Sequence, residues 1–269
     1  NQNIGDLRDA AHANELDLAA LRALPGVVAA SAVIAVPMGR SGWQTSVALK
    51  ADERVDGADR AAAMYMADEQ LLDALGNRII EGRMFERSEI TPFKQGDRPS
   101  PPVVLVSKDL AQTLFPSESA IGKMINITGD QGQPQQRIIG VVDHIATPWP
   151  RSRNPDRVVF SPYAITDSTN FLIRTEAGER DRVMAQVEGA LFGVDRNRII
   201  ASIRSFDEIR ADAYRNDLAM AVLLAVIGIA LLAVTAFGIV GQASFWVTQR
   251  TRQIGTRRAL GARKRDILR

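Results

Sequence analysis

The chain has 269 residues, with 33 Lys and Arg against 31 Asp and Glu, and it contains no cysteine. These totals exclude a disulfide scaffold and a zinc–thiolate site. The formal net charge of +2 is unevenly distributed, because the first 217 residues carry a net charge of −5. An acidic large domain with only 6% aromatic residues argues against a partner made of nucleic acid.

The first 204 residues alternate between strand-like and helix-like patterns. A helix is predicted over 14–24, with Asn14 as its N-cap and Leu16, Ala20 and Leu24 on its buried stripe. Turn or loop signals cover 79–85 and the proline-rich stretch 92–102. We predict further helices over 68–75, 108–115 and 179–192, and strands over 27–37, 43–50, 61–66, 103–106, 124–128, 137–142, 157–160, 170–174 and 198–203. Gly76 and Gly193 are the predicted stops of the first and third of these helices, and Ser107 is the predicted cap of the second. The third helix should stack Val183, Val187 and Leu191 on one face, and the turn 129–134 should join strands 124–128 and 137–142 in a hairpin. This order favours an α+β fold with mixed sheets, arranged in two lobes.

Signals for catalysis or for a bound cofactor are weak in this sequence. Gly122-Lys123 is followed by Met124 and lacks the upstream glycine of a phosphate-binding loop. His12 and His144 are the two histidines, and Asp143-His144 has no third ligand at a fitting spacing, so a hydrogen-bonded or loop histidine is the favoured interpretation. We therefore expect no catalytic, cofactor-binding or metal-binding residues, and we expect any ATP to be held by another protein.

One long helix is predicted to start at Ser205 and to enter a membrane. Ser205 and Glu208 have the spacing of a capping box, and no proline follows before the apolar run. The 30 residues 218–247 include no Asp, Glu, Lys, Arg or His, and the 23 residues 218–240 would extend about 34 Å as a helix. That length crosses a hydrocarbon core of ~30 Å, so 205–247 is predicted to form a stalk and a transmembrane helix.

Small and polar residues recur along one side of the predicted span. Such a seam allows another transmembrane helix to approach closely, although alanine and glycine are also common on surfaces that face lipid. We favour the packing interpretation slightly, which implies other transmembrane helices as neighbours. The seam consists of Ala221, Ala225, Gly228, Thr235 and Gln242, with Leu232 and Ile239 between them.

A strongly basic tail follows the span. Residues 248–269 include eight Lys or Arg and one acid, Asp266. Basic residues close to a span indicate its cytoplasmic side, which places 248–269 in the cytoplasm and 1–215 outside it. Because the outer domain then has to follow an earlier crossing, we expect a further transmembrane helix upstream.

The tail also has a regular pattern of apolar, basic and glycine residues. Ile254, Arg258 and Gly261 would share one helical face, and Gly255 would permit a sharp turn or close contact. Its sequence resembles the segment after the second span of MacB/FtsX-type ABC-transporter permeases, in which it forms a coupling helix on the ATPase. Where that family usually has acids, this chain has Gln249 and Gln253. The residues that the resemblance assigns to the ATPase interface are Arg250, Thr251, Ile254, Gly255, Arg257, Arg258, Ala259, Leu260, Gly261 and Ala262.

The resemblance extends outward through 24–27 and 106–123, which are similar to the extracytoplasmic domain of the same family. It implies a MacB-like domain over 1–204, built from a βαβ porter-like lobe and a β-rich lobe, and a cytoplasmic coupling segment over 248–269. It further implies a non-enzymatic permease in a bacterial inner membrane, with a cytoplasmic ABC ATPase subunit, the lipid bilayer and a second permease copy as partners. Motion driven by ATP would reach the outer domain through the long helix, for substrate efflux.

A second class of protein fits the same pattern. A membrane-bound sensor would combine an outer ligand-binding domain, one span and a cytoplasmic signalling module. The residues after 269 distinguish the two classes, because a permease continues into another apolar run of ~20 residues and a sensor into heptad-patterned linker helices.

Overall fold

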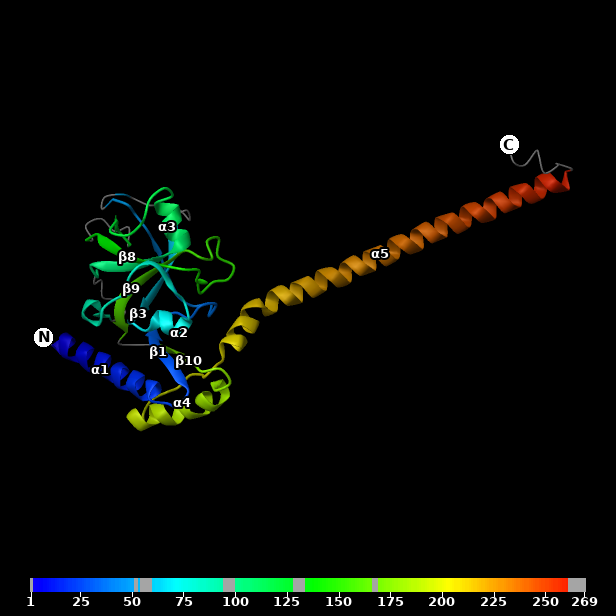
Figure 1. Ribbon diagram of the computed structural model, residues 1–269. Helices are drawn as coiled ribbons and strands as arrows, with labels where there is room; N and C mark the ends of the chain where they lie inside the picture. The colour runs from blue at the N-terminus through cyan, green and yellow to red at the C-terminus, as the bar shows by residue number, and fades with distance from the viewer. Residues whose placement is uncertain are drawn as a thin grey trace. The chain divides into compact units, whose positions relative to one another are not determined.

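The computed structural model describes residues 2–50, 53, 60–93, 100–127, 134–165 and 169–260. The chain divides into two units, Asn1–Ala213 and Tyr214–Arg269, of which the first contains the whole sheet (Figure 1). Its helices are α1 (Gln2–Arg22), α2 (Leu71–Leu75), α3 (Lys108–Leu114), α4 (Arg180–Val194) and the start of α5 (Phe206–Ala259). Its strands are β1 (Val27–Val33), β2 (Trp43–Ser46), β3 (Ala61–Ala67), β4 (Ile79–Gly82), β5 (Thr91–Phe93), β6 (Val103–Ser107), β7 (Met124–Ile125), β8 (Gln136–Val142), β9 (Val158–Ile165) and β10 (Asn170–Thr175).

One mixed sheet organises the first unit, Asn1–Ala213, which we call the outer unit. Its strand order is β10-β1-β3-β9-β6-β8-β4, with β2 beside β3, β5 beside β9 and β7 beside β8. Neighbours β6 and β8 are parallel and α3 lies between them in sequence, which makes a βαβ unit, whereas β6 and β9 are antiparallel. A bridge between Ala48 and Asn126, with both N···O distances at 2.8 Å, joins the chain after β2 to the chain after β7 and curls the sheet.

The side chains of the central strands alternate between two buried layers, as the period of two in a strand requires. On β6, Val104 and Val106 belong to the layer that α3 covers with Leu110 and Leu114. Leu105 faces the opposite layer, which α2 covers. The predicted α+β fold with a mixed sheet is confirmed.

A third apolar layer lies where α1 and α4 lie next to each other beside β1 and β10 (Figure 1). Val183, Val187 and Leu191 of α4 are buried at their four-residue spacing, as predicted. The helix continues past the expected stop at Gly193 to Val194. It shares its layer with Leu21 of α1, so the two helices and the strand pair form one packed assembly.

The first helix was predicted with the wrong start and the wrong face. It begins at Gln2 instead of 14, and Asn14 lies inside it, where the side-chain amide donates hydrogen bonds to the Ile165 carbonyl and to Thr169 Oγ1 instead of capping. Leu16 is 47% exposed, whereas Leu18 and Leu21 are buried. An asparagine side chain can cap the start of a helix, or it can form hydrogen bonds with a distant segment of the chain. The sequence pattern alone did not distinguish these two roles.

Two other predicted segments were assigned the wrong state. Residues 79–82 form strand β4, which pairs with β8, instead of a turn. Among these four residues only Gly82 has a positive φ, of 78°, as in a turn. A Cβ at Gly82 would lie 2.1 Å from the Ile139 carbonyl oxygen. Residues 198–203 form no strand, because they pass along the α1–α4 layer with Ile200 and Ile203 packed against it. Apolar side chains in an irregular segment that packs on a core give the same short pattern as a buried strand.

Several local signals are confirmed. Gly76 ends α2 in the left-handed conformation (φ 73°), and Ser107 caps α3 by accepting a hydrogen bond from the Leu110 amide at 3.4 Å. Strands β7 and β8 pair as the expected antiparallel hairpin, whose predicted turn lies outside the described residues. Part of the proline-rich stretch 92–102 also lies outside them, and its beginning belongs to strand β5.

Candidate membrane helix and coupling segment

Helix α5 begins with the capping box that its sequence predicts. The Ser205 amide donates to a Glu208 carboxylate oxygen at 2.8 Å, and the Glu208 amide donates to Ser205 Oγ at 3.3 Å. The two residues thus satisfy each other's backbone donors at the helix start. From Phe206 the helix runs without interruption to Ala259, twelve residues beyond the predicted end at 247.

The outer unit holds the first turn of α5 through polar contacts. Arg180, the first residue of α4, lies 3.2 Å from the Asp207 carboxylate, measured from Nη1 to Oδ2. Arg204, just before the helix, lies 2.8 Å from Asp212 two turns later. All these side chains are at least 40% exposed, so each pair contributes up to about 1 kcal/mol and is weakened by salt.

A buried ion pair holds the segment that leads into α5. The side chain of Asp17, on α1, is fully buried, and its Oδ2 lies 2.6 Å from Nη1 of Arg198, which is 20% exposed. Burial raises the pKa of the Asp17 carboxyl, and the positive charge of Arg198 opposes that rise. This contact joins the first helix to the connection between α4 and α5. It was not predicted, although an aspartate between Leu16 and Leu18 in an otherwise apolar stretch is a recognisable signal of a buried charge.

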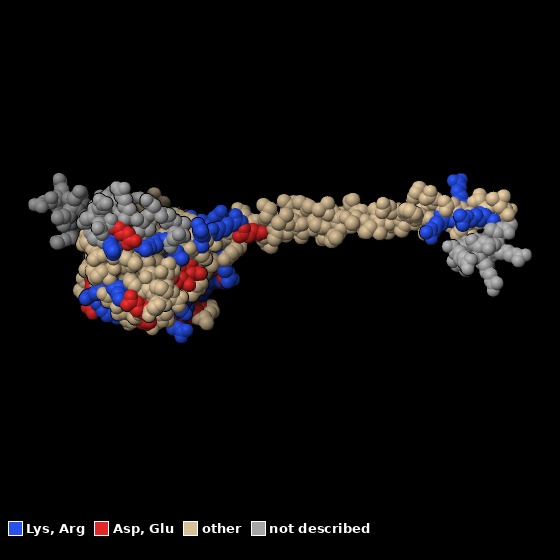
Figure 2. All heavy atoms as spheres, turned by 90° about the horizontal axis from the view of Figure 1, so that it is seen from above, with Lys and Arg blue, Asp and Glu red and all other residues tan. Residues whose placement is uncertain are grey.

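The middle of α5 is apolar on all sides. Figure 2 shows the helix free of acidic and basic side chains along its shaft, with basic side chains returning toward its C-terminal end. An 18-residue window within Phe206–Arg257 has a mean hydropathy of 2.8, and none of that window is buried within the described residues. Large apolar side chains such as Leu231 (63% exposed) and Phe237 (78% exposed) have no protein core to cover them. An all-round apolar helix of this length is suited to a lipid environment.

The predicted seam lies on the exposed surface of this apolar section. Gly228 is half-buried by its own neighbours, and a Cβ at this position would meet no other atom within 4 Å. Thr235 donates its hydroxyl proton to the Leu231 carbonyl at 2.8 Å, a bond that a helix supplies to its own threonines. The hydroxyl proton of Thr235 is therefore already used, and the small residues remain as the basis of the packing prediction.

The tail segment continues the same helix instead of starting a new one. Gly255, expected to permit a turn, lies inside α5, and a Cβ there would meet nothing within 4 Å. Thr251 donates its hydroxyl proton to the Val247 carbonyl at 2.7 Å. Leu260, the first residue after the helix, is 88% exposed, and Ile254 is 38% exposed. Gly261 and Ala262 lie outside the described residues.

The positions of the motif on the helix define two faces. Successive residues turn by ~100°, so Arg250, Ile254, Arg257 and Arg258 lie within about 60° of one direction. Arg252 lies on the opposite face of the helix. Ala259 lies on the same side as Arg252. We call the first group, together with Leu260, which directly follows the helix, the coupling face.

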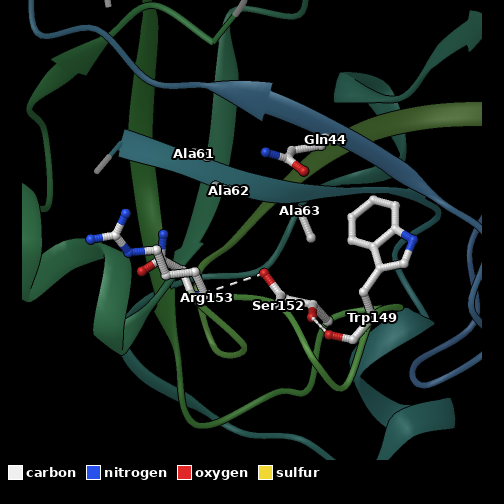
Figure 3. Close-up of a pocket in the computed structure, with 9 residues that line it drawn as sticks. Gln44, Ala61, Ala62, Ala63, Trp149, Ser152 and Arg153 are labelled. Atoms are coloured by element: carbon white, nitrogen blue, oxygen red, sulfur yellow. Dashed lines mark hydrogen bonds between the residues drawn. The ribbon is translucent and has the colours of Figure 1, made fainter. Parts of the chain in front are cut away.

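The outer unit also contains a shallow cavity of about 230 Å³ between β2, β3 and the loop before β9 (Figure 3). The amide of Gln44 and the indole of Trp149 point toward Ala63, whereas the guanidinium of Arg153 extends away from them. Among the described residues that line the cavity, Arg153 is the one that carries a charge, and Ser152 Oγ accepts a hydrogen bond from the Asn154 amide at 3.3 Å. These described residues thus include no pair of titratable groups for acid–base chemistry.

Both units of the chain contain residues that match known protein families. Residues 3–190 match the family described as MacB-like periplasmic core domain, and residues 225–269 match the FtsX-like permease C-terminal family. The first match covers more than half of the chain.

Curated relatives are similar along the same region. The chain is 28% identical over 204 residues to the macrolide export ATP-binding/permease protein MacB of Chromobacterium violaceum, which covers 72% of this chain and 29% of that protein. It is 26% identical over 228 residues to MacB 1/2 of Paracoccus denitrificans, covering 78% of this chain and 31% of that protein. The chain thus spans about a third of the length of the relatives it matches.

Two crystal structures show a more distant similarity. The periplasmic region of MacB from Actinobacillus actinomycetemcomitans is 15% identical with a TM-score of 0.42, covering 65% of this chain and 72% of that one. The extracellular domain of the ABC-type transporter YknZ from Gram-positive bacteria is 17% identical with a TM-score of 0.43, covering 66% and 82%. The family matches themselves lead to one conclusion: the chain belongs to the MacB/FtsX-type ABC transporter permeases.

Proposed function

We propose that this chain transmits motion between an ATPase on the cytoplasmic side of an inner membrane and its own outer domain, in the service of substrate export. The observation that carries the proposal is the continuity of α5 from Phe206 to Ala259. This one helix includes three parts: a first turn that forms ion pairs with the outer unit, the apolar section, and the arginine-rich coupling face. A helix without a proline or another break resists sharp kinking and is therefore suited to transmit displacement along its axis.

The proposal places the outer unit outside the cytoplasm and residues 248–269 inside it. Aromatic side chains support the placement of the apolar section across a bilayer: Tyr214 stands at one end of it, and Phe245 and Trp246 stand at the other, where amphipathic rings favour the membrane interface. The basic residues beyond Trp246 favour the cytoplasmic side. The seam of small residues is proposed to contact other transmembrane helices, and a second permease copy is proposed to complete the assembly.

The ATPase is proposed to bind the coupling face. Exposed arginines, Arg250 and Arg257, stand there beside the apolar side chains of Ile254 and Leu260, and this mixture of charged and apolar groups is typical of a protein interface. The names of the curated relatives join ATP binding and permease in one protein. The ATPase that serves this chain is therefore either a separate subunit or another part of one polypeptide, and the experiment is the same for both.

The experiment reverses charge on one face of the helix and then on the other. Arg258→Glu, or Leu260→Asp, in the full-length permease assembled with its ATPase in lipid should abolish the dependence of ATP hydrolysis on the permease. Arg252→Glu makes the same change of charge on the opposite face and should leave that dependence intact. Folding of the outer domain, read by protease resistance, should be the same in all variants. The interface assignment fails if ATPase binding and stimulation survive both coupling-face changes.

A further inference from the structure

Three side chains that can bind a metal converge in the outer unit from separate segments of the chain. Asp109 lies in the first turn of α3, His144 follows β8, and Asp156 precedes β9. One ligand atom from each lies within 4.8 Å of the other two. His144 Nδ1 and Asp156 Oδ1 are 3.3 Å apart. The fold thus gives His144 two carboxylate neighbours from other segments of the chain, and Asp143 is not one of them.

The grouping occupies a position where sheets commonly bind ligands. Strands β6 and β8 are parallel neighbours, and the last residues of both, Ser107 and Val142, are paired. Asp109 and His144 each stand two residues beyond these strand ends. Open sheets with parallel strands place their ligands at the carboxyl ends of such strands.

Hydrogen bonds fix the backbone that bears the three side chains. Ser107 Oγ accepts from the Leu110 amide at 3.4 Å and from the Val158 amide at 3.0 Å, which joins the start of α3 to the start of β9. The Asn77 side-chain amide donates to the His144 carbonyl at 2.7 Å. A backbone fixed in this way is a precondition for holding a metal at defined distances.

The local charge favours a cation. One oxygen of each carboxylate and one nitrogen of the imidazole lie within 4.8 Å of one another, and two like charges this close repel. Among the described residues, neither Asp109 nor Asp156 forms an ion pair with a lysine or an arginine. A divalent cation would offset both negative charges.

We propose that Asp109, His144 and Asp156 form a binding site for a divalent first-row transition metal, with Zn²⁺ as the best-fitting ion. One imidazole nitrogen with two carboxylate oxygens suits such ions, whereas Mg²⁺ and Ca²⁺ select oxygen ligands alone. The distance of 3.3 Å between His144 Nδ1 and Asp156 Oδ1 is close to the ~3.4 Å that separates two ligands at a tetrahedral zinc with bonds of about 2.0–2.1 Å. Three protein ligands leave a fourth position for water or for a side chain of a partner.

The chain itself offers a sharp test, since it has no cysteine and two histidines. The full chain in lipid nanodiscs is titrated with ZnCl₂ by calorimetry and with CoCl₂ by visible absorption, which reports the coordination of the bound ion. We expect one ion per chain, and His144→Ala should weaken binding by roughly 10- to 100-fold or more, because even indirect contacts to a metal ligand have that effect. Asp109→Asn should weaken it in the same direction.

The matched control is His12→Ala. His12 is exposed on α1, and its ring lies 3.9 Å from Glu15. Its removal should leave the affinity and the cobalt spectrum unchanged. The proposal does not depend on the transport proposal above. It is overturned if the wild-type chain binds no stoichiometric ion, if His144→Ala binds as tightly as the wild type, or if MgCl₂ binds as well as ZnCl₂.

Discussion

Removal of the guanidinium of Arg198 should destabilise the outer unit far more than removal of an exposed arginine. Arg198→Met leaves the Asp17 carboxylate fully buried without its counter-charge 2.6 Å away. Breaking a buried pair in this way costs about 3–5 kcal/mol of unfolding free energy. Arg204→Ala breaks the exposed pair with Asp212 and should cost at most about 1 kcal/mol.

The assay is thermal and chemical unfolding of the full chain in nanodiscs, followed by tryptophan fluorescence. In a Trp246→Phe background the signal comes from Trp43 and Trp149, both in the outer unit. The double variant Asp17→Asn, Arg198→Met removes both charges and should recover most of the lost stability. Equal stability of Arg198→Met and Arg204→Ala at neutral pH would refute the reasoning, because it would show that loss of Arg198 leaves no unpaired buried charge at Asp17.

The same pair predicts a dependence on pH. Because burial raises the pKa of Asp17 above its unfolded value of ~3.9, the fold favours the protonated carboxyl. The contribution of the Asp17 carboxyl to the free energy of unfolding is fully present below its pKa in the unfolded chain. That contribution is lost as the pH rises through the pKa of Asp17 in the folded chain. Asp17→Asn cannot lose a proton, so its melting temperature should gain on the wild type between acid and neutral pH. A difference that does not change with pH would contradict this assignment.

Two further predictions concern local structure. Ser205→Ala removes one half of the capping box and should speed amide hydrogen exchange in the first turn of α5 by an amount equivalent to about 0.5–2 kcal/mol. Exchange in the apolar section should not change. Equal exchange rates in the first turn of the variant and the wild type would exclude a capping role for Ser205. Gly76→Ala places a Cβ 1.9 Å from Arg174 Nη2 in a backbone at φ 73°, whereas Gly122→Ala at φ 80° meets no atom within 4 Å. Both changes carry backbone strain, so a larger fall in melting temperature for Gly76→Ala measures the clash with Arg174, and equal falls would exclude it.

Features governed by short-range chemistry could be predicted from the sequence. The Ser205–Glu208 box, the Ser107 cap and the glycine after α2 depend on residues within a few positions, and all three are present. The charge-free run of α5 was equally readable, because membrane length and the absence of charge are properties of composition. The helical continuation to Ala259 was not expected, since Gly255 suggested a turn that no neighbouring contact enforces.

Features that depend on tertiary contacts could not be predicted. Asn14 serves as a donor to the chain near Ile165, 151 positions away, and no local pattern announces such a role. The ion pair of Asp17 and Arg198, and the grouping of Asp109 with His144 and Asp156, likewise unite distant segments. The segment 198–203 was predicted as a strand because its apolar residues are spaced like one, yet Ile200 and Ile203 pack on the layer that α1 and α4 form, a contact between distant segments.

The central claim is that α5 crosses a bilayer with its coupling face in the cytoplasm. The chain has no cysteine, so single cysteines can be placed at Ser117 in the outer unit and at Gln253 beside the coupling face, both of which are exposed. A membrane-impermeant maleimide applied to intact cells whose outer membrane has been opened should label Ser117→Cys at once. Gln253→Cys should react only after the inner membrane is permeabilised. Labelling of Gln253→Cys in sealed cells, or protection of Ser117→Cys, would contradict the account.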